Sequence, residues 1–227
     1  DMAKLVQQHL EEKGMRILLS KCVEEFLGDD KVTAIKAGDD VIEADLFISA
    51  FGVRANTKIA VEAGVPLGES RGIRTNGRME TDIKDVYAVG DCAEASHLVT
   101  HKPICAQLGT TAVRQGKVAG TNAGGDYSLF SGVLASAVTL LFEIEVGNTG
   151  LTETAAQRNG IEVITGAITS KTRADYFPGA KAIKIKLVVE KESQRIIGGQ
   201  IIGGEEVTQR INSLSFAIQK GMTVREL

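Results

Sequence analysis

Tryptophan is absent from this sequence of 227 residues, and aromatic residues make up only 4% of it. The core must therefore consist of valine, isoleucine, leucine and alanine. The net charge of −3 lacks the basic excess of a nucleic-acid-binding protein, so no nucleic-acid partner is expected. The longest nearly apolar run, residues 133–142, is far shorter than the ~20 residues that span a bilayer, and no membrane partner is expected either.

Cysteines are few, and they lack the spacing of a functional group. Cys22, Cys92 and Cys105 form no CxxC pair and no metal-binding pattern, so we predict no metal site and inert thiols. A low, odd number of cysteines and the absence of a visible signal peptide indicate a cytoplasmic protein. His97 and His101 lie in a polar stretch and are interpreted as ordinary surface residues. A GxGxxG loop, which binds the pyrophosphate of a dinucleotide, is also missing.

The N-terminal part of the sequence has the pattern of the last elements of an α/β unit. Residues 2–13 have helical periodicity, and two short runs typical of β-strands, 32–36 and 41–44, flank a Gly-Asp-Asp turn. This predicts a helix followed by a hairpin. A short, mostly apolar run at 46–51 predicts a short buried strand, and the first domain is expected to span residues 1–54.

A second domain is predicted over residues 55–123. A short buried strand at 85–91 ends in an acidic residue, and residues 106–119 have the pattern of a helix. The glycine-rich sequence at 122–126 is the clearest linker in the chain and marks the end of this domain.

The pattern changes after the linker. Residues 127–227 alternate strand and helix signals in the manner of an α+β domain with a three-stranded antiparallel meander. The expected strands are 137–146, 161–169, 182–190 and 195–202, and the expected helices are 153–158 and 205–220. The fold class is therefore α/β plus α+β.

Asp91 is the first candidate functional residue. It stands at the C-terminal end of the predicted strand, where open α/β sheets bind their ligands, and Gly90 before it lets a ligand approach the backbone. A carboxylate there can accept hydrogen bonds from sugar or ribityl hydroxyls. An aspartate after a strand is also a common turn former, and the spacing alone leaves both interpretations open.

The segment TDIKDVYAVGD at residues 81–91 resembles the second FAD-binding motif of the pyridine nucleotide–disulphide oxidoreductases. The resemblance implies that Asp91 binds the ribityl chain of FAD. It also implies that the N-terminus of the downstream helix faces the N1–C2=O edge of the flavin, where it would stabilise negative charge. Simple packing of that helix is the alternative. The implied cofactor-binding residues are Gly90, Asp91, Gly109, Thr110, Thr111 and Ala112.

Two further stretches carry the resemblance. FGVRAN at 51–56 is similar to the GxxPN segment where the family's chain leaves its NAD domain, with Ala55 in place of proline. The C-terminal sequences around 176–181, 195–200 and 220–224 resemble the interface domain of the NADH oxidase and coenzyme A disulfide reductase branch. The architecture implied is partial FAD- and NAD-binding, Rossmann-like domains followed by a dimerisation domain.

The resemblance implies the C-terminal portion of an FAD-dependent NAD(P)H oxidoreductase. A hydride would pass from NAD(P)H to FAD, and electrons would then reach a thiol or disulfide substrate or O2 through a redox cysteine outside this chain. A homodimer would form through residues 127–227, and Tyr176 would approach the active site of the other subunit as a catalytic residue. Tyr176 packing in a loop beside Pro178 is the alternative.

Two other functions compete with this reading of the sequence. A rubredoxin- or ferredoxin-reductase type of flavoprotein shares the FAD motif but does not need the Tyr-Phe-Pro segment at 176–178. A non-catalytic dimerisation module is the second alternative for the isolated chain, which we expect to be colourless and inactive because it lacks both pyrophosphate loops.

Overall fold

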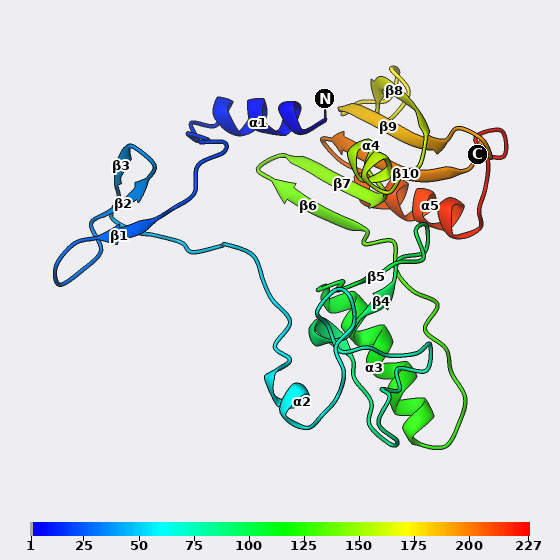
Figure 1. Ribbon diagram of the computed structural model, residues 1–227. Coiled ribbons are helices and arrows are strands. Elements are labelled where there is room, and N and C mark those ends of the chain that lie inside the picture. The colour runs from blue at the N-terminus through cyan, green and yellow to red at the C-terminus, as the bar shows by residue number, and fades with distance from the viewer. Residues whose placement is uncertain (1) are drawn as a thin grey trace. The chain divides into compact units, whose positions relative to one another are not determined.

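The computed structural model describes residues 2–227, which form two compact units, residues 3–53 and residues 54–227. Figure 1 shows the helices and strands of both units in chain order. Among the described residues, no helix combines the length and the apolar character needed to cross a membrane.

The N-terminal unit contains one helix and a small antiparallel sheet. Helix α1 spans Met2–Glu12, as predicted. The sheet has the order β1-β2-β3, with β1 at Glu25–Leu27, β2 at Ala34–Ala37 and β3 at Asp40–Glu43. Strands β2 and β3 form the predicted hairpin, whose turn includes Gly38 at a φ of 64°, a conformation that glycine adopts without strain. Strand β1 was not predicted.

The apolar run at residues 46–51 is not a strand, and the prediction is wrong at this point. A strand needs a hydrogen-bonded neighbour, and no described residue pairs with this run. Leu46, Ile48 and Phe51 are instead 76%, 84% and 70% exposed. The run is largely apolar, but its side chains are left exposed in the described part of the chain.

The first part of the C-terminal unit is built around one long helix. Its elements are α2, Lys58–Glu62; the single-turn helix η1, Gly90–Cys92; β4, Ala95–Ser96; β5, Pro103–Ile104; and α3, Gly109–Ala123. Helix α3 begins at Gly109 instead of Ala106, and it continues through Asn122 into the predicted linker. The amide of Asn122 accepts from the Ser128 N–H and donates to the Ser128 carbonyl, which holds the chain against the end of the helix.

The predicted strand at residues 85–91 is also wrong. The chain there makes only an isolated bridge from Tyr87 to Glu80 and then enters η1. Hydrophobic packing holds this segment in place of a ladder: Met79, which is 1% exposed, and Ala88 lie in one cluster with Val118 and Ala119 of α3. The irregular chain is thereby fixed against the long helix.

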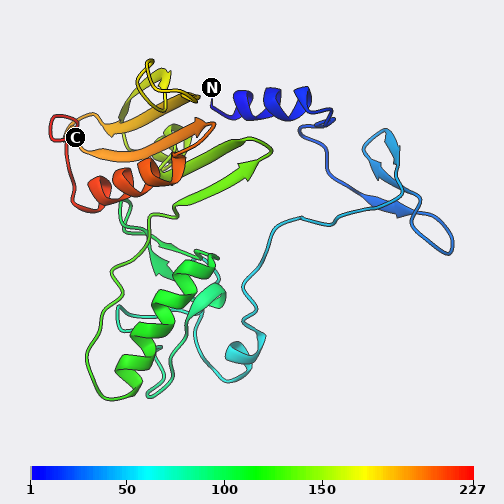
Figure 2. The same ribbon diagram turned by 180° about the vertical axis from the view of Figure 1, so that it is seen from behind.

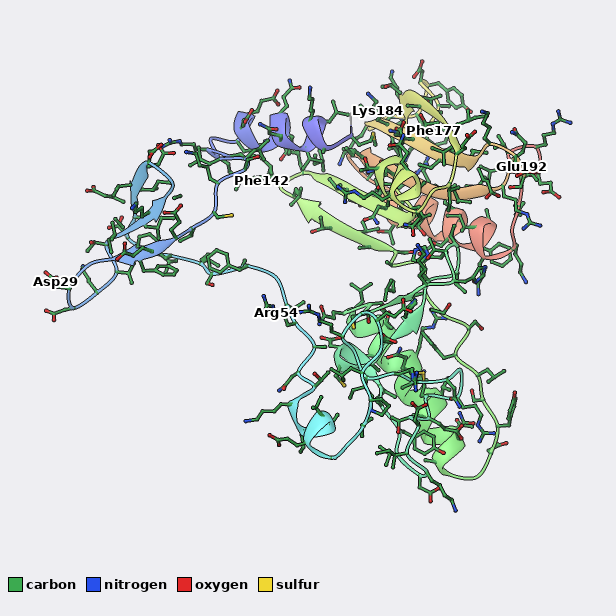
Figure 3. All side chains as sticks on the ribbon, in the orientation of Figure 1. Asp29, Arg54, Phe142, Phe177, Lys184 and Glu192 are labelled. Atoms are coloured by element: carbon green, nitrogen blue, oxygen red, sulfur yellow. The ribbon has the colours of Figure 1, made fainter. Side chains whose placement is uncertain are left out.

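The second part of this unit is a five-stranded antiparallel sheet in the order β6-β7-β10-β9-β8, seen from two sides in Figures 1 and 2. The strands are β6, Ala137–Leu141; β7, Ile144–Gly150; β8, Val163–Lys171; β9, Ala182–Glu190; and β10, Ile196–Gly203. The predicted three-stranded meander is present as β8, β9 and β10. The single strand predicted at 137–146 is in fact the hairpin of β6 and β7, which pairs with β10 and extends the meander to five strands. Phe142, labelled in Figure 3, lies in the two-residue turn of this hairpin.

Helices cover the two faces of this sheet. On β9, Val188 packs with Ala156 of α4, Glu153–Arg158, while Ile183 packs with Ile211 of α5, Val207–Gln219. Alternate residues of a strand point to opposite faces, so α4 and α5 lie on opposite sides. Gly147 on β7 lets α5 approach closely, because a Cβ there would lie 2.7 Å from Ile211 Cγ1.

Candidate functional site

Asp91 lies in a sharp turn whose shape depends on Gly90. Val89 is extended, and Gly90, with a φ of 80°, begins the single-turn helix η1. A side chain at position 90 would find room, since a Cβ would lie 3.5 Å from Ala112 Cβ, but it would be forced into a left-handed conformation. The glycine therefore permits the reversal that places Asp91 at the surface.

The carboxylate of Asp91 is available to a ligand. Asp91 is exposed, and within residues 2–227 its carboxylate takes part in no hydrogen bond or ion pair. The carbonyl oxygen of the same residue accepts a hydrogen bond from Gln107 Nε2 at 3.4 Å. The turn is thus tied to the protein through its backbone, and the side chain is left as a free acceptor.

The N-terminus of α3 supplies donors beside this turn. Leu108, the residue before the helix, is extended and provides no side-chain cap. The first hydrogen bond that closes the helix is donated by Ala112 N to Leu108 O at 3.0 Å. The N–H groups of Gly109, Thr110 and Thr111 consequently meet no acceptor among the described residues, and the positive end of the helix dipole lies there.

Packing and one buried hydrogen bond join the turn to the helix. Gly90 lies against Ala112, and the Gly90 N–H donates to Gln115 Oε1 at 2.7 Å. Ala112 and Gln115 are three residues apart on α3, so they share a face of the helix. The structure therefore brings together all six of the predicted cofactor-binding positions, in the turn and in the first turn of α3.

This arrangement has a definite chemical use. A free carboxylate can accept from hydroxyl groups, while a row of free backbone N–H groups at a helix N-terminus can bind a carbonyl oxygen or an anion. A ligand with hydroxyls at one position and an electron-rich ring edge or anionic group at another would satisfy both. The geometry suits the ribityl chain and pyrimidine edge of a flavin.

Tyr176, the predicted catalytic residue, lies in the loop between β8 and β9, away from this turn in sequence and in fold. Its side chain is 85% exposed, and its ring stands 5.4 Å from that of Phe177, which Figure 3 labels. The Arg210 guanidinium donates to the Thr172 carbonyl at 2.9 Å, and Thr172 N donates to the Lys181 carbonyl at 2.8 Å. The base of the loop is therefore fixed, and its aromatic tip is left open.

The two histidines differ in their surroundings. His101 is exposed, as predicted, but His97 is only 5% exposed, which corrects the prediction of a surface residue. His97 Nδ1 accepts from the backbone N–H groups of Val99 at 3.2 Å and Thr100 at 3.4 Å. Burial, with a smaller effect of the neighbouring His101, lowers the pKa of His97 below its ordinary value of 6.5.

The three cysteines form no disulfide, and no group of metal-ligating residues is found within the described part of the chain. Cys92, next to Asp91, donates to the Val89 carbonyl at 3.4 Å. Cys105 Sγ lies 3.1 Å from Ser70 Oγ, which donates to Glu94 Oε1 at 2.7 Å. These contacts place Cys92 and Cys105 in ordinary polar packing.

Sequence reasoning missed Gln115. A glutamine within an amphipathic helix is normally a solvent-facing residue, yet Gln115 is 0% exposed. Its spacing of three residues from Ala112 was the available signal, because this places it on the face that contacts the Gly90 turn.

Comparison with known families finds two matches along the chain. Residues 1–125 match the family described as "Pyridine nucleotide-disulphide oxidoreductase". Residues 136–227 match the family described as "Pyridine nucleotide-disulphide oxidoreductase, dimerisation domain". The two matches account for most of the chain, and they support the expected order of a Rossmann-like region followed by a dimerisation-domain sheet.

Individual proteins are similar over the whole chain. An "NADH oxidase" of Methanocaldococcus jannaschii is 41% identical over all of this chain and 50% of its own length. An "NAD(P)H coenzyme A polysulfide/persulfide reductase" of Pyrococcus horikoshii is 34% identical over 98% of this chain and 51% of its own length. The structure of an NAD-dependent persulfide reductase from A. fulgidus matches with a TM-score of 0.96 and 39% identity, over 99% of this chain and 42% of its own. The chain thus spans about half the length of these curated relatives.

Proposed function

The chain belongs to the pyridine nucleotide–disulphide oxidoreductase family, and we propose that it forms the C-terminal part of an FAD-dependent NAD(P)H oxidoreductase. The relatives named NADH oxidase and coenzyme A polysulfide/persulfide reductase support this branch over a rubredoxin or ferredoxin reductase. The observation that carries the proposal is the free carboxylate of Asp91 beside the uncapped N-terminus of α3.

The residues of this site fit FAD. Asp91, with its unpartnered carboxylate, would accept from ribityl hydroxyls, and the free N–H groups of Gly109, Thr110 and Thr111 would donate to an electron-rich acceptor such as the flavin N1–C2=O edge. Gly109 leaves open space, since a Cβ there would meet no atom within 4 Å. When bound, FAD supplies two-electron chemistry, taking a hydride from NAD(P)H. The protein's part is to orient the cofactor and to stabilise negative charge at its pyrimidine end.

The remaining chemistry needs groups beyond those described. Residues 3–53 supply the closing part of an NAD(P)H-binding domain, and the exposed apolar run at 46–51 supports the presence of further chain that buries it. A redox cysteine outside this sequence would deliver electrons to a thiol or disulfide substrate or to O2. The lack of disulfides among Cys22, Cys92 and Cys105 supports a cytoplasmic location.

Residues 127–227 form the dimerisation domain in this proposal, with a homodimer as the working protein. The loop that carries Tyr176 presents an exposed tyrosine from a fixed base, which suits a side chain that acts outside its own fold. Tyr176 is therefore proposed to act at the active site of the other subunit. The isolated chain would then be a dimerisation module without activity of its own.

Replacement of Asp91 by alanine in the full-length protein tests the flavin site. Charge-assisted hydrogen bonds are worth about 1.5–3 kcal/mol, so we expect FAD affinity to fall roughly ten- to a hundred-fold. The measurement is the ratio of flavin absorbance to protein after purification, followed by titration of the apoprotein with FAD. Glu69→Ala is the matched control, because it removes another exposed carboxylate outside the turn. Unchanged FAD affinity in Asp91→Ala would remove Asp91 from the site.

A further inference from the structure

Gln115 has surroundings that are unusual for a helical glutamine. Its side chain is completely buried, and its Oε1 accepts the Gly90 N–H at 2.7 Å. The bond spans 25 positions of sequence and joins the middle of α3 to the residue before Asp91. This hydrogen bond connects the backbone of the Gly90 turn to helix α3.

The bond determines the turn in a way that packing alone does not. Gly90 adopts a φ of 80°, and a glycine in this position has many alternative conformations, because it has no Cβ to exclude them. Fixing its N–H selects one of them. Gly90 and Asp91 both lie in η1, so the conformation of Gly90 sets the direction of the Asp91 Cα–Cβ bond and thereby the region that its carboxylate can reach.

The amide of Gln115 is retained at a cost. Its Nε2 is buried and has no acceptor among the described residues. An unpaired buried donor is unfavourable, and an apolar side chain of equal length would fill the same volume without it. The feature that an apolar residue could not supply is the acceptor Oε1.

We propose that Gln115 is a positioning residue of the FAD site, which holds the Gly90 N–H and thereby sets the position of Asp91 relative to the N-terminus of α3. The inference rests on the proposed function. It adds a residue that touches no part of the cofactor and acts through Asp91.

A double-mutant cycle in the full-length protein tests this. Gln115→Met removes the acceptor, and we expect FAD affinity, measured by titration of the apoprotein, to fall on the order of tenfold. Because Gln115 acts through Asp91, adding Gln115→Met to Asp91→Ala should weaken binding by less than about twofold further.

Asn122→Leu is the matched control, since it removes a buried amide from the same helix at a distance from the turn. It should lower the unfolding temperature, and its effect on FAD affinity should be independent of Asp91. Gln115→Asn, which withdraws the amide by one methylene, replaces the methionine variant if that protein fails to fold.

The outcomes separate this inference from the proposed function. If Asp91→Ala leaves FAD affinity unchanged, the flavin site itself is wrong. If Asp91→Ala weakens binding while the effects of Gln115→Met and Asp91→Ala multiply, only the positioning role of Gln115 is overturned.

Discussion

The imidazole of His97 links one residue to the pH dependence of stability. Its Nδ1 faces two backbone N–H donors, from Val99 and Thr100, so protonation would place a third N–H against them. This opposition and the burial of the ring agree with the lowered pKa of His97. The folded protein therefore binds the proton less readily than the unfolded chain does.

From this we predict a loss of stability in acid that is specific to His97. The unfolded state binds more protons between pH 6.5 and the lower folded-state pKa, so stability is fully present above 6.5 and is lost as the pH falls below it. If the two states differ by one bound proton, the free energy of unfolding changes by at most about 1.4 kcal/mol per pH unit. His97→Asn, which keeps an acceptor near Nδ1 but cannot titrate, should flatten this part of the profile in urea unfolding at pH 5 to 8.

His101→Asn is the control, because it removes an exposed imidazole and should leave most of the slope. An identical slope in His97→Asn and the original protein would show that other groups bind the proton.

At the scale of elements, the sequence predicted what local signals determine. The helix at 2–12, the hairpin of β2 and β3 and the helices α4 and α5 were all expected from periodicity, caps and turn residues. The turn between β6 and β7 was missed because Phe142 occupies it at a φ of 55°, where glycine or asparagine is the usual signal.

The remaining errors depend on distant parts of the chain. Residues 46–51 have the composition of a strand but no partner to pair with, and strand formation cannot be read from composition alone. At the site, Asp91 and the start of α3 could be named from motifs. Gln115 was missed, because its spacing from Ala112 shows only which face of α3 it shares, and its contact is with Gly90, 25 positions away in the sequence.

The loop between β8 and β9 supports an element-scale prediction on Tyr176. Arg210 also donates to Glu206, and hydrogen bonds from Arg210 and Arg173 lower the pKa of the Glu206 carboxyl. This ion-pair cluster and the Arg210 contact to Thr172 hold the base of the loop. The tip of the loop carries the exposed hydroxyl of Tyr176, which is not needed for packing against any described residue.

Tyr176→Phe in the full-length protein should therefore slow turnover by about tenfold or more and leave the dimer and the unfolding temperature unchanged. Steady-state kinetics, sedimentation and thermal unfolding together make the measurement. Phe177→Leu is the control for a general disturbance of the loop, and it should affect turnover less. Unaltered turnover in Tyr176→Phe would limit Tyr176 to packing.

At the scale of the whole molecule, the sheet of residues 137–203 leaves part of one face uncovered. Helix α5 packs against β7 and β10, while the same face of β8 and β9 carries an apolar groove of about 430 Å³. Ile168, which is 61% exposed, lines it together with Ile185, to which it is paired across the strands. Exposed apolar surface of this kind marks an interaction site, and in the proposed homodimer the partner subunit would cover it.

Ile168→Glu should then weaken dimerisation of the full-length protein by roughly a hundredfold or more, because an unpaired carboxylate in an apolar interface is costly to bury. Thr169→Glu is the matched control: it adds the same charge to the adjacent residue of β8, which points to the opposite face of the sheet. Sedimentation velocity over a range of concentrations distinguishes the two variants. A dimer that resists Ile168→Glu but dissociates with Thr169→Glu would place the interface on the α4 side. If both variants dimerise as tightly as the original protein, β8 lies outside the interface. Another part of residues 127–227 would then have to form it.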